Sequence, residues 1–127
     1  MISSLTGSVL HAGADFVEVG VGGVGFTVAV TSDVARAARA GEDIRLHTAL
    51  IVREDALSLY GFSDRAECVL FTTLLGVTGV GPKSALGVLS ALSVDQIAQA
   101  VADDDDAPFR RVSGIGPKTA KLIVVQL

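Results

Sequence analysis

A nine-residue segment occurs twice in this chain, and this repeat constrains the fold more than any other feature. The segment from Val77 to Ala85 reads VTGVGPKSA, and the segment from Val112 to Ala120 reads VSGIGPKTA. The two copies lie 35 residues apart, and every difference between them is conservative. The chain is therefore expected to build one local structure twice. The alternative is a pair of ordinary helix–turn–helix corners with no shared role.

Each copy predicts a tight turn between two helices. Gly79 suits a left-handed helix end because it has no Cβ, and Pro82 suits the first position of the next helix. Val80 is expected to point inward, while Gly81 lets a foreign backbone approach closely. The unpaired N–H groups at the start of the second helix, together with the charge of Lys83, favour an anion. The turn therefore predicts a site for one backbone phosphate that reads no base.

The second copy has the same parts, and two such sites in one rigid body would hold both strands of a duplex across its minor groove. This pattern is typical of a tandem helix-hairpin-helix DNA-binding domain. Arg110 and Arg111 lie close to the second copy in sequence. The predicted DNA-binding residues are Gly79, Val80, Gly81, Lys83 and Ser84 in the first copy, and Gly114, Ile115, Gly116, Lys118, Thr119 and Lys121 in the second.

The charge is unevenly distributed along the chain. Ten Lys and Arg against fourteen Asp and Glu give a net charge of −4, which argues against binding nucleic acid through bulk charge alone. Residues 107–127 nevertheless contain four basic side chains and no acidic one. The acidic run from Asp103 to Asp106 is interpreted as a solvated helix end, with one Asp capping the next helix, and not as a metal cluster. A local basic surface is therefore expected on an acidic protein.

The first sixty residues predict β-structure, and the rest predicts helices. The expected strands are residues 5–10, 16–19, 26–30, 44–51 and 56–62, with a short capped helix at 32–40. That order is typical of a five-stranded OB-type barrel. The expected helices are residues 64–75 (on the spacing of Ala66, Val69, Leu70 and Leu74), 82–92, 94–102, 107–112 and 117–127. The predicted fold class is α+β, with a barrel domain at 1–62 and a tandem helix-hairpin-helix domain at 63–127.

Two Gly-rich segments match nucleotide-binding motifs but lack the context that those motifs need. Residues 20–25 fit GxGxxG, yet the following residues alternate like a strand, whereas the motif must open a helix. Residues 76–84 are similar to a Walker A loop, but Pro82 displaces the Lys by one position, and Arg111 stands where the first copy has Gly76. A small nucleotide-dependent enzyme stays an alternative, which nucleotide titration would test.

Conventional catalytic and metal sites find little support in the sequence. His11 and His47 lie in predicted strands without a constellation around them, and Cys68 is expected on the buried face of a helix as a small hydrophobe. A single cysteine excludes an internal disulfide and a Cys-rich zinc site. No catalytic residue, metal or cofactor is therefore predicted.

No membrane partner is predicted either. The longest uncharged stretch, residues 68–82, is shorter than the roughly 20 residues that a spanning helix needs. The N-terminus lacks the basic region of a signal peptide. The expected location is cytoplasmic.

Glu54 and Asp55 follow Arg53 between two predicted strands, so they are expected at a hairpin tip. Composition alone favours a solvated polar turn there. The segment VREDALSLYGF at residues 52–62 is more specific than a turn requires. Together with LTG at residues 5–7, GGVGF at 22–26 and the two Gly-hydrophobic-Gly-Pro-Lys turns, it resembles the RuvA family of bacterial Holliday-junction-recognition subunits. The resemblance covers the whole chain.

This resemblance implies a homotetramer, or an octamer of two tetramers, that holds open a four-way DNA junction. In the family, the pair matching Glu54 and Asp55 forms an acidic pin at the crossover, where its carboxylates repel phosphates. The resemblance further implies a non-catalytic subunit whose ATP-driven motor is RuvB, with RuvC resolvase as a further partner. The resemblance implies that family members bind RuvB through a third domain, and no such domain is expected within residues 1–127.

The chain departs from the family after the second turn, where Lys121 and Leu122 replace an acidic residue followed by Arg. Lys121 is expected to take over the contact of that Arg, or the contact is lost. A generic helix-hairpin-helix duplex clamp, serving a DNA repair enzyme, is the alternative function. The sequence does not decide whether the assembly is a tetramer or an octamer. It also leaves open the roles of Arg36, Arg39 and Arg53.

Overall fold

The computed structural model describes residues 1–127, which form two compact units, Met1–Cys68 and Val69–Leu127. The first unit is a closed β-barrel, and the second is helical. This arrangement confirms the predicted α+β class. The two units are described in turn.

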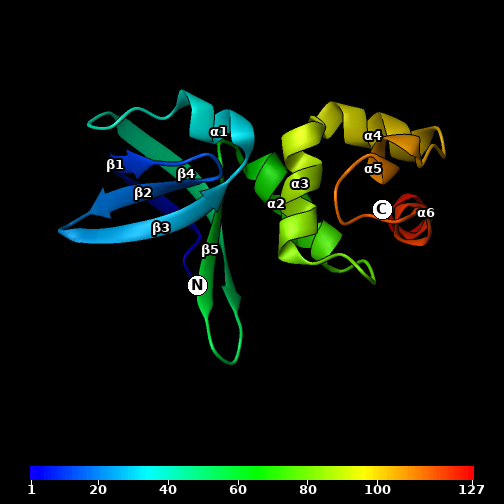
Figure 1. The fold of residues 1–127 in the computed structure, drawn as a ribbon, viewed down its shortest axis with the longest axis horizontal. Helices are drawn as coiled ribbons and strands as arrows, with labels where there is room; N and C mark the ends of the chain where they lie inside the picture. Colours follow the sequence, from blue (N-terminus) through cyan, green and yellow to red (C-terminus); the bar gives the residue numbers. More distant parts are fainter. The chain divides into compact units, whose positions relative to one another are not determined.

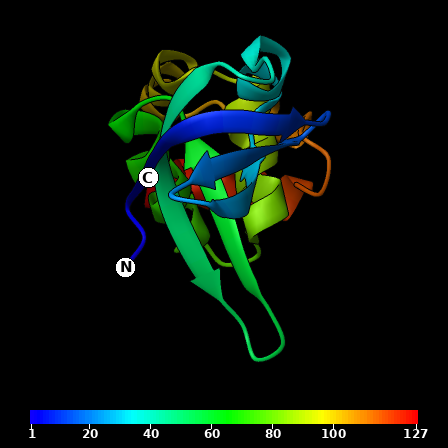
Figure 2. The ribbon, with the colours of Figure 1, turned by 90° about the vertical axis from the view of Figure 1, so that its left-hand side faces the viewer.

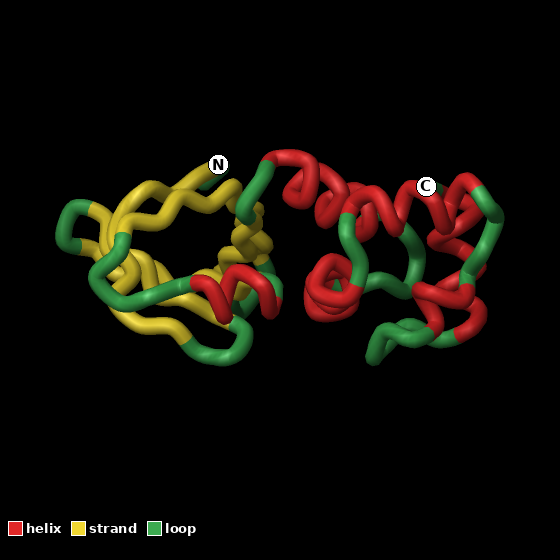
Figure 3. Tube along the Cα trace, turned by 90° about the horizontal axis from the view of Figure 1, so that it is seen from above, coloured by secondary structure: helices red, strands yellow, loops and turns green.

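Five strands close the barrel of the first unit in the order β1-β2-β3-β5-β4 (Figure 1). Figure 3 shows these strands as a ring. Every neighbouring pair is antiparallel except β3 and β5, which are parallel. This order confirms the predicted OB-type barrel. The elements of the unit are β1 (Ser4–Ala12), β2 (Phe16–Val21), β3 (Val24–Val30), α1 (Ser32–Ala37), β4 (Asp43–Val52) and β5 (Leu57–Phe62).

Alternating side chains fill the barrel, because successive residues of a strand point to opposite faces. Val17 and Val19 of β2, and Val28 and Val30 of β3, are at most 1% exposed. Burying each of these side chains contributes roughly 1.5–3 kcal/mol. The connection after β3 is fixed by Thr31, whose side-chain oxygen accepts a hydrogen bond from the N–H of Val34 and so caps α1.

Two hairpins of the barrel differ in their turns. Between β2 and β3, Gly22 and Gly23 have φ of +56° and +85° in a two-residue turn that glycine makes without steric cost. The GxGxxG segment therefore forms a hairpin and opens no helix. The β4–β5 hairpin has a longer loop, closed by a 2.9 Å hydrogen bond from the N–H of Arg53 to the carbonyl of Ala56. Figure 2 shows this hairpin extending well beyond the other strands.

Five helices follow the barrel, at the predicted places in the sequence. They are α2 (Arg65–Leu75), α3 (Pro82–Ala91), α4 (Val94–Ala102), α5 (Ala107–Arg110) and α6 (Pro117–Gln126). Asp64 starts α2 by accepting a hydrogen bond from the N–H of Glu67. Ser93 and Gln96 form a reciprocal capping box at the start of α4. No single helix is long and apolar enough to cross a membrane; α3 and α4 reach that length and composition only as a pair, with a bend of 97° between them.

The buried face of α2 differs from the apolar spacing read from the sequence. Phe71 and Leu74 are fully buried, whereas Ala66 is exposed and Val69 is 59% exposed. Of the predicted spacing only Leu74 is fully buried, and Phe71, which the spacing did not include, completes the buried face. Burial of a Phe ring removes more apolar area from water than burial of Ala or Val does.

Candidate nucleic-acid interface

The two copies of the repeat have the same backbone geometry. Gly79 has φ of +91°, and Gly114 has φ of +87°. The next glycine of each copy, Gly81 or Gly116, is the N-cap of the following helix, with φ and ψ of −94° and 175° in one and −84° and 174° in the other. The expectation that the repeat builds one local structure twice is therefore confirmed.

The same internal hydrogen bond closes both turns. The N–H of Val80 donates to the carbonyl of Val77, and the N–H of Ile115 donates to the carbonyl of Val112, each at 3.1 Å. The side chains of Val80 and Ile115 are 7% and 5% exposed, so both point inward as the sequence predicts. With the N–H engaged and the side chain buried, these two residues shape the turn.

Unpaired N–H groups remain at the start of each second helix. In the first copy, the N–H groups of Gly81, Lys83 and Ser84 have no backbone acceptor, and Pro82 has no N–H to offer. No acidic residue lies in the first turn of α3 or of α6. The positive end of each helix dipole is therefore not neutralised, and an anion is favoured there.

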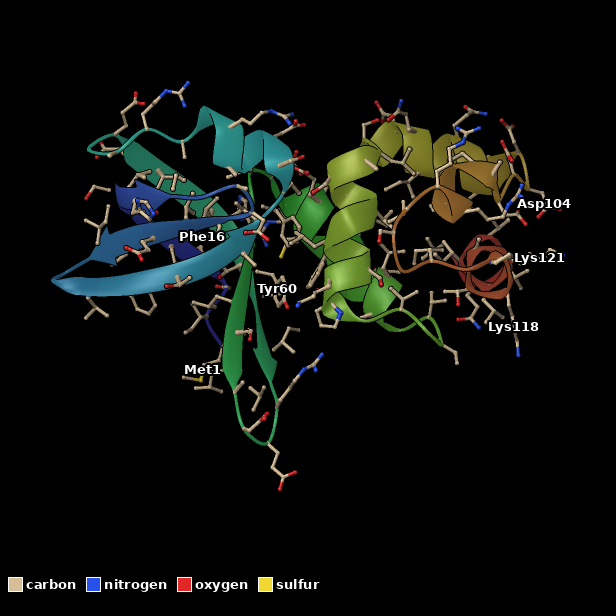
Figure 4. The ribbon with its side chains drawn as sticks, viewed as in Figure 1. Met1, Phe16, Tyr60, Asp104, Lys118 and Lys121 are labelled. Carbon is tan, nitrogen blue, oxygen red and sulfur yellow. The ribbon has the colours of Figure 1, made fainter.

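Exposed lysines surround these helix starts. Lys83 begins α3, and Lys118 and Lys121 lie on α6, where Figure 4 shows both side chains extending away from the helix. None of the three is in a salt bridge. Their charge is available to a ligand.

Each turn lies against the first residues of the other copy's second helix. A Cβ placed on Gly79 would lie 2.9 Å from the Oγ1 of Thr119, and a Cβ placed on Gly114 would lie 2.9 Å from the Oγ of Ser84. These contacts are reciprocal, so the two phosphate sites predicted from the sequence are neighbours within one compact unit. The hydroxyls of Ser84 and Thr119 thereby lie between the two turns.

The acidic run before the second copy has local structural roles. The carboxylate of Asp103 accepts a hydrogen bond from the Gln99 side chain, and that of Asp105 accepts one from the N–H of Ala107. Asp106 forms a salt bridge of 2.9 Å with the Nε of Arg110. The run therefore ends α4 and starts α5, as the sequence interpretation states, although the Asp at the N-cap of α5 makes no capping bond with its side chain.

Glu54 and Asp55 lie in the loop of the β4–β5 hairpin, as predicted, and both are exposed. Val52 and Leu57, the last residue pair of the hairpin ladder, are 68% and 72% exposed. The acidic tip is thus carried on a protruding hairpin whose end is apolar. Sequence reasoning identified the acids but not the exposed apolar pair below them.

Other reactive side chains have ordinary surroundings. Burial raises the pKa of the Cys68 thiol, against an opposing effect of the nearby Arg65 charge. Cys68 is only half-buried. Burial also raises the pKa of Glu67, partly offset by a hydrogen bond from Ser63. His11 stacks at a tilt on Phe16, with ring centroids 5.7 Å apart. No group of three or more His, Cys, Asp and Glu side chains is placed to hold a metal.

Comparison with known proteins agrees with both units. Residues 1–61 match the RuvA N terminal domain, and residues 71–127 match a SAM-like helix-hairpin-helix tandem. The whole chain is 61% identical to the Holliday junction branch migration complex subunit RuvA of Leifsonia xyli, 56% to that of Clavibacter michiganensis and 50% to that of Chloroflexus aggregans. It spans 61%, 59% and 66% of the length of these relatives. Because these alignments cover all 127 residues and both units match, this chain belongs to the RuvA family.

Proposed function

We propose that this chain binds four-way junction DNA through the backbone, with the two repeated turns as phosphate sites. One observation carries this proposal: two turns of identical geometry present free N–H groups and unpaired lysines side by side. A pair of fixed phosphate sites suits a duplex arm, since phosphate contacts position a protein without reading sequence. The proposed contacts are those of Gly79, Gly81, Lys83 and Ser84, and of Gly114, Gly116, Lys118, Thr119 and Lys121, with Val80 and Ile115 shaping the turns.

The acidic hairpin tip supplies the preference for a junction. Glu54 and Asp55 are exposed on a protruding loop, where their charge repels any phosphate chain that crosses it. A continuous duplex would have to cross this point, whereas an open junction leaves it free. The structure-specific binding therefore comes from attraction at the turns and repulsion at the tip.

A homotetramer is part of the proposal, with the hairpin tips gathered at the crossover point of the junction. The exposed pair of Val52 and Leu57 supports it, because apolar side chains at the end of a protruding hairpin gain from being covered by another copy. Assembly into an octamer would enclose the junction on both sides.

The relatives are named as subunits of a branch migration complex and are longer than this chain. We therefore propose a non-catalytic, cytoplasmic role in recombination and DNA repair, in which the ATPase is the separate RuvB motor and RuvC resolvase a further partner. Residues 1–62 supply the acidic tip and the contacts between subunits. Residues 63–127 supply the phosphate sites.

The test of junction binding is a titration of an immobile four-way junction against a linear duplex of equal length, at two salt concentrations. We expect the junction to bind at least about tenfold more tightly, which is about 1.4 kcal/mol. Both affinities should fall as salt rises, because phosphate contacts release counterions. Equal affinity for the two DNAs would contradict the role of the acidic tip and favour a generic duplex clamp.

Lys118 provides a direct test of the phosphate sites. We expect Lys118→Ala to weaken binding to junction and duplex alike and to reduce the slope of log affinity against log salt by about 0.9. Lys118→Arg, which keeps the charge, should leave the slope unchanged. A slope that stays the same in Lys118→Ala would show that this lysine contacts no phosphate.

A further inference from the structure

Two adjacent arginines before the second turn, Arg110 and Arg111, differ in whether they form a salt bridge. The Nε of Arg110 lies 2.9 Å from the Oδ1 of Asp106, and the charges of these two side chains offset each other. Arg111 is exposed and has no salt bridge. The two residues are neighbours in sequence and identical in chemistry, yet only Arg111 has its charge available to a ligand.

Arg111 lines a hollow that both copies of the repeat share. One wall is α3, with Lys83, Ser84, Gly87 and Ala91, and the other is the second turn, with Arg111, Val112, Ser113 and Gly114. In Figure 1 the segment after α5 passes beside α3. The hollow exists because small residues on α3 admit the second turn. A Cβ on Gly87, for example, would lie 3.2 Å from the Cγ1 of Val112.

The chemistry of this hollow is that of an anion site. Two cations without a salt bridge, Lys83 and Arg111, come from different copies of the repeat, and Ser84 and Ser113 line the same hollow. The free N–H groups at the start of α3 add the positive end of a helix dipole. A guanidinium presents a planar fork of donors that matches a phosphate, and a lysine adds a point charge.

The two copies differ at this place. The position of Arg111 is occupied in the first copy by Gly76, and the position of Gly87 is occupied in the second copy by Leu122. The start of α3 therefore has a cation of the second copy beside it. The start of α6 has no arginine of the first copy in the equivalent place, because Gly76 stands there. The two phosphate sites are built from unequal parts.

We infer that Arg111 and Lys83 hold the same DNA phosphate, so that the site at the start of α3 is composed of both hairpins. This inference rests on the proposed function, since it names a further residue of one of the proposed phosphate sites. It assigns to Arg111 a contact that the repeat alone does not reveal, because the contact crosses from one copy to the other.

The test compares Arg111→Gln with Arg110→Gln, which removes the same charge one residue away. Junction affinity is measured across a series of salt concentrations. Arg111→Gln should weaken binding about fivefold to tenfold, because a charge-assisted hydrogen bond to phosphate is lost at a site that water still reaches. Arg110→Gln should change affinity less than about twofold, and Arg111→Lys should restore part of the loss. Equal losses in the two Gln variants would overturn the inference, because they would reflect net charge alone.

The double variant Lys83→Ala with Arg111→Gln shows whether the two cations share one phosphate. One shared phosphate predicts a loss of about 0.9 in the salt slope, and two separate phosphates predict about 1.8. A loss near the larger value would overturn the shared site.

Lys118→Ala separates this inference from the function on which it rests. If Lys118→Ala weakens binding and Arg111→Gln does not, the shared site is wrong while the phosphate sites stand. If neither variant weakens binding, both the shared site and the proposed function are wrong. Competition by millimolar ATP at unchanged ionic strength would show that the hollow prefers a free nucleotide, which also overturns the assignment to DNA.

Discussion

Gly79→Ala is expected to lower the free energy of unfolding of the helical unit by about 2–4 kcal/mol. Two effects add at this position. A φ of +91° is strained for any residue with a Cβ, and the new Cβ would lie 2.9 Å from the Oγ1 of Thr119 and 3.6 Å from its Cγ2. Only the rotamer of Thr119 that turns its Cβ hydrogen toward Gly79 would relieve this contact, and a β-branched residue in a helix has few χ1 rotamers available. Urea unfolding followed by circular dichroism measures the change.

Gly114→Ala is the matched variant in the second copy. Its backbone strain is the same, with φ of +87°, but its steric partner is Ser84, whose single hydroxyl can rotate away. We therefore expect Gly114→Ala to cost about 1–2 kcal/mol, less than Gly79→Ala. We expect Thr119→Ser to recover part of the stability that Gly79→Ala loses. If Gly79→Ala and Gly114→Ala lower the free energy of unfolding equally, and Thr119→Ser recovers nothing, the contact with Thr119 adds no cost.

Gly81→Ala separates binding from folding. Gly81 has φ of −94°, which any residue adopts, and a Cβ there would meet no atom within 4 Å. The free energy of unfolding should change by less than about 0.5 kcal/mol, because two effects oppose each other: Ala restricts the unfolded chain more than Gly does, but it is a poorer N-cap residue. DNA affinity should nevertheless fall, because the Cβ occupies space that the approaching phosphate needs. Unchanged affinity would place the phosphate away from Gly81.

Replacing both carboxylates of the hairpin tip, in Glu54→Gln with Asp55→Asn, is expected to abolish most of the preference for junction DNA. Duplex affinity should rise, and the ratio of junction to duplex affinity should fall from about tenfold or more to below about threefold, a change of roughly 0.7 kcal/mol or more. The physical reason is that the amides keep the size and polarity of the side chains while removing the charge that repels phosphates. Competition binding with both DNAs in one solution measures the ratio.

A matched control for the tip lies elsewhere on the same barrel. Asp33→Asn removes a carboxylate of α1 that is paired with Arg36, and it should leave the ratio unchanged. The proposed repulsion acts across solvent, so the effect of the tip should shrink as salt rises, with a Debye length of about 8 Å at physiological ionic strength. A junction preference that survives the double change at the tip, at any salt concentration, would show that Glu54 and Asp55 do not act as a pin.

The sequence determined most of the local structure, because its signals are local. Alternating Val residues placed the strands, paired glycines at residues 22 and 23 placed a hairpin, and the repeat placed two turns with left-handed glycines. The backbone preferences of Gly and Pro depend only on the neighbouring peptide units, so these features follow from the order of residues. The face of α2 did not follow in this way, since the apolar spacing predicted a face with Ala66 and Val69, whereas packing buries Phe71 and Leu74.

The tertiary structure alone decided which turns are neighbours. The pairing of Arg110 is local, since Asp106 lies four residues before it on a helical turn, and Arg111 has no acid at that spacing. The repeat indicated two equal phosphate sites, whereas their packing sets Thr119 against Gly79, and Ser84 against Gly114, and places Arg111 and Lys83 on the walls of one hollow. The residues brought together in this way are about 30 to 40 positions apart. A repeat specifies the local structure of each copy, but only the close packing of the two copies fixes which residues of one copy lie beside the other.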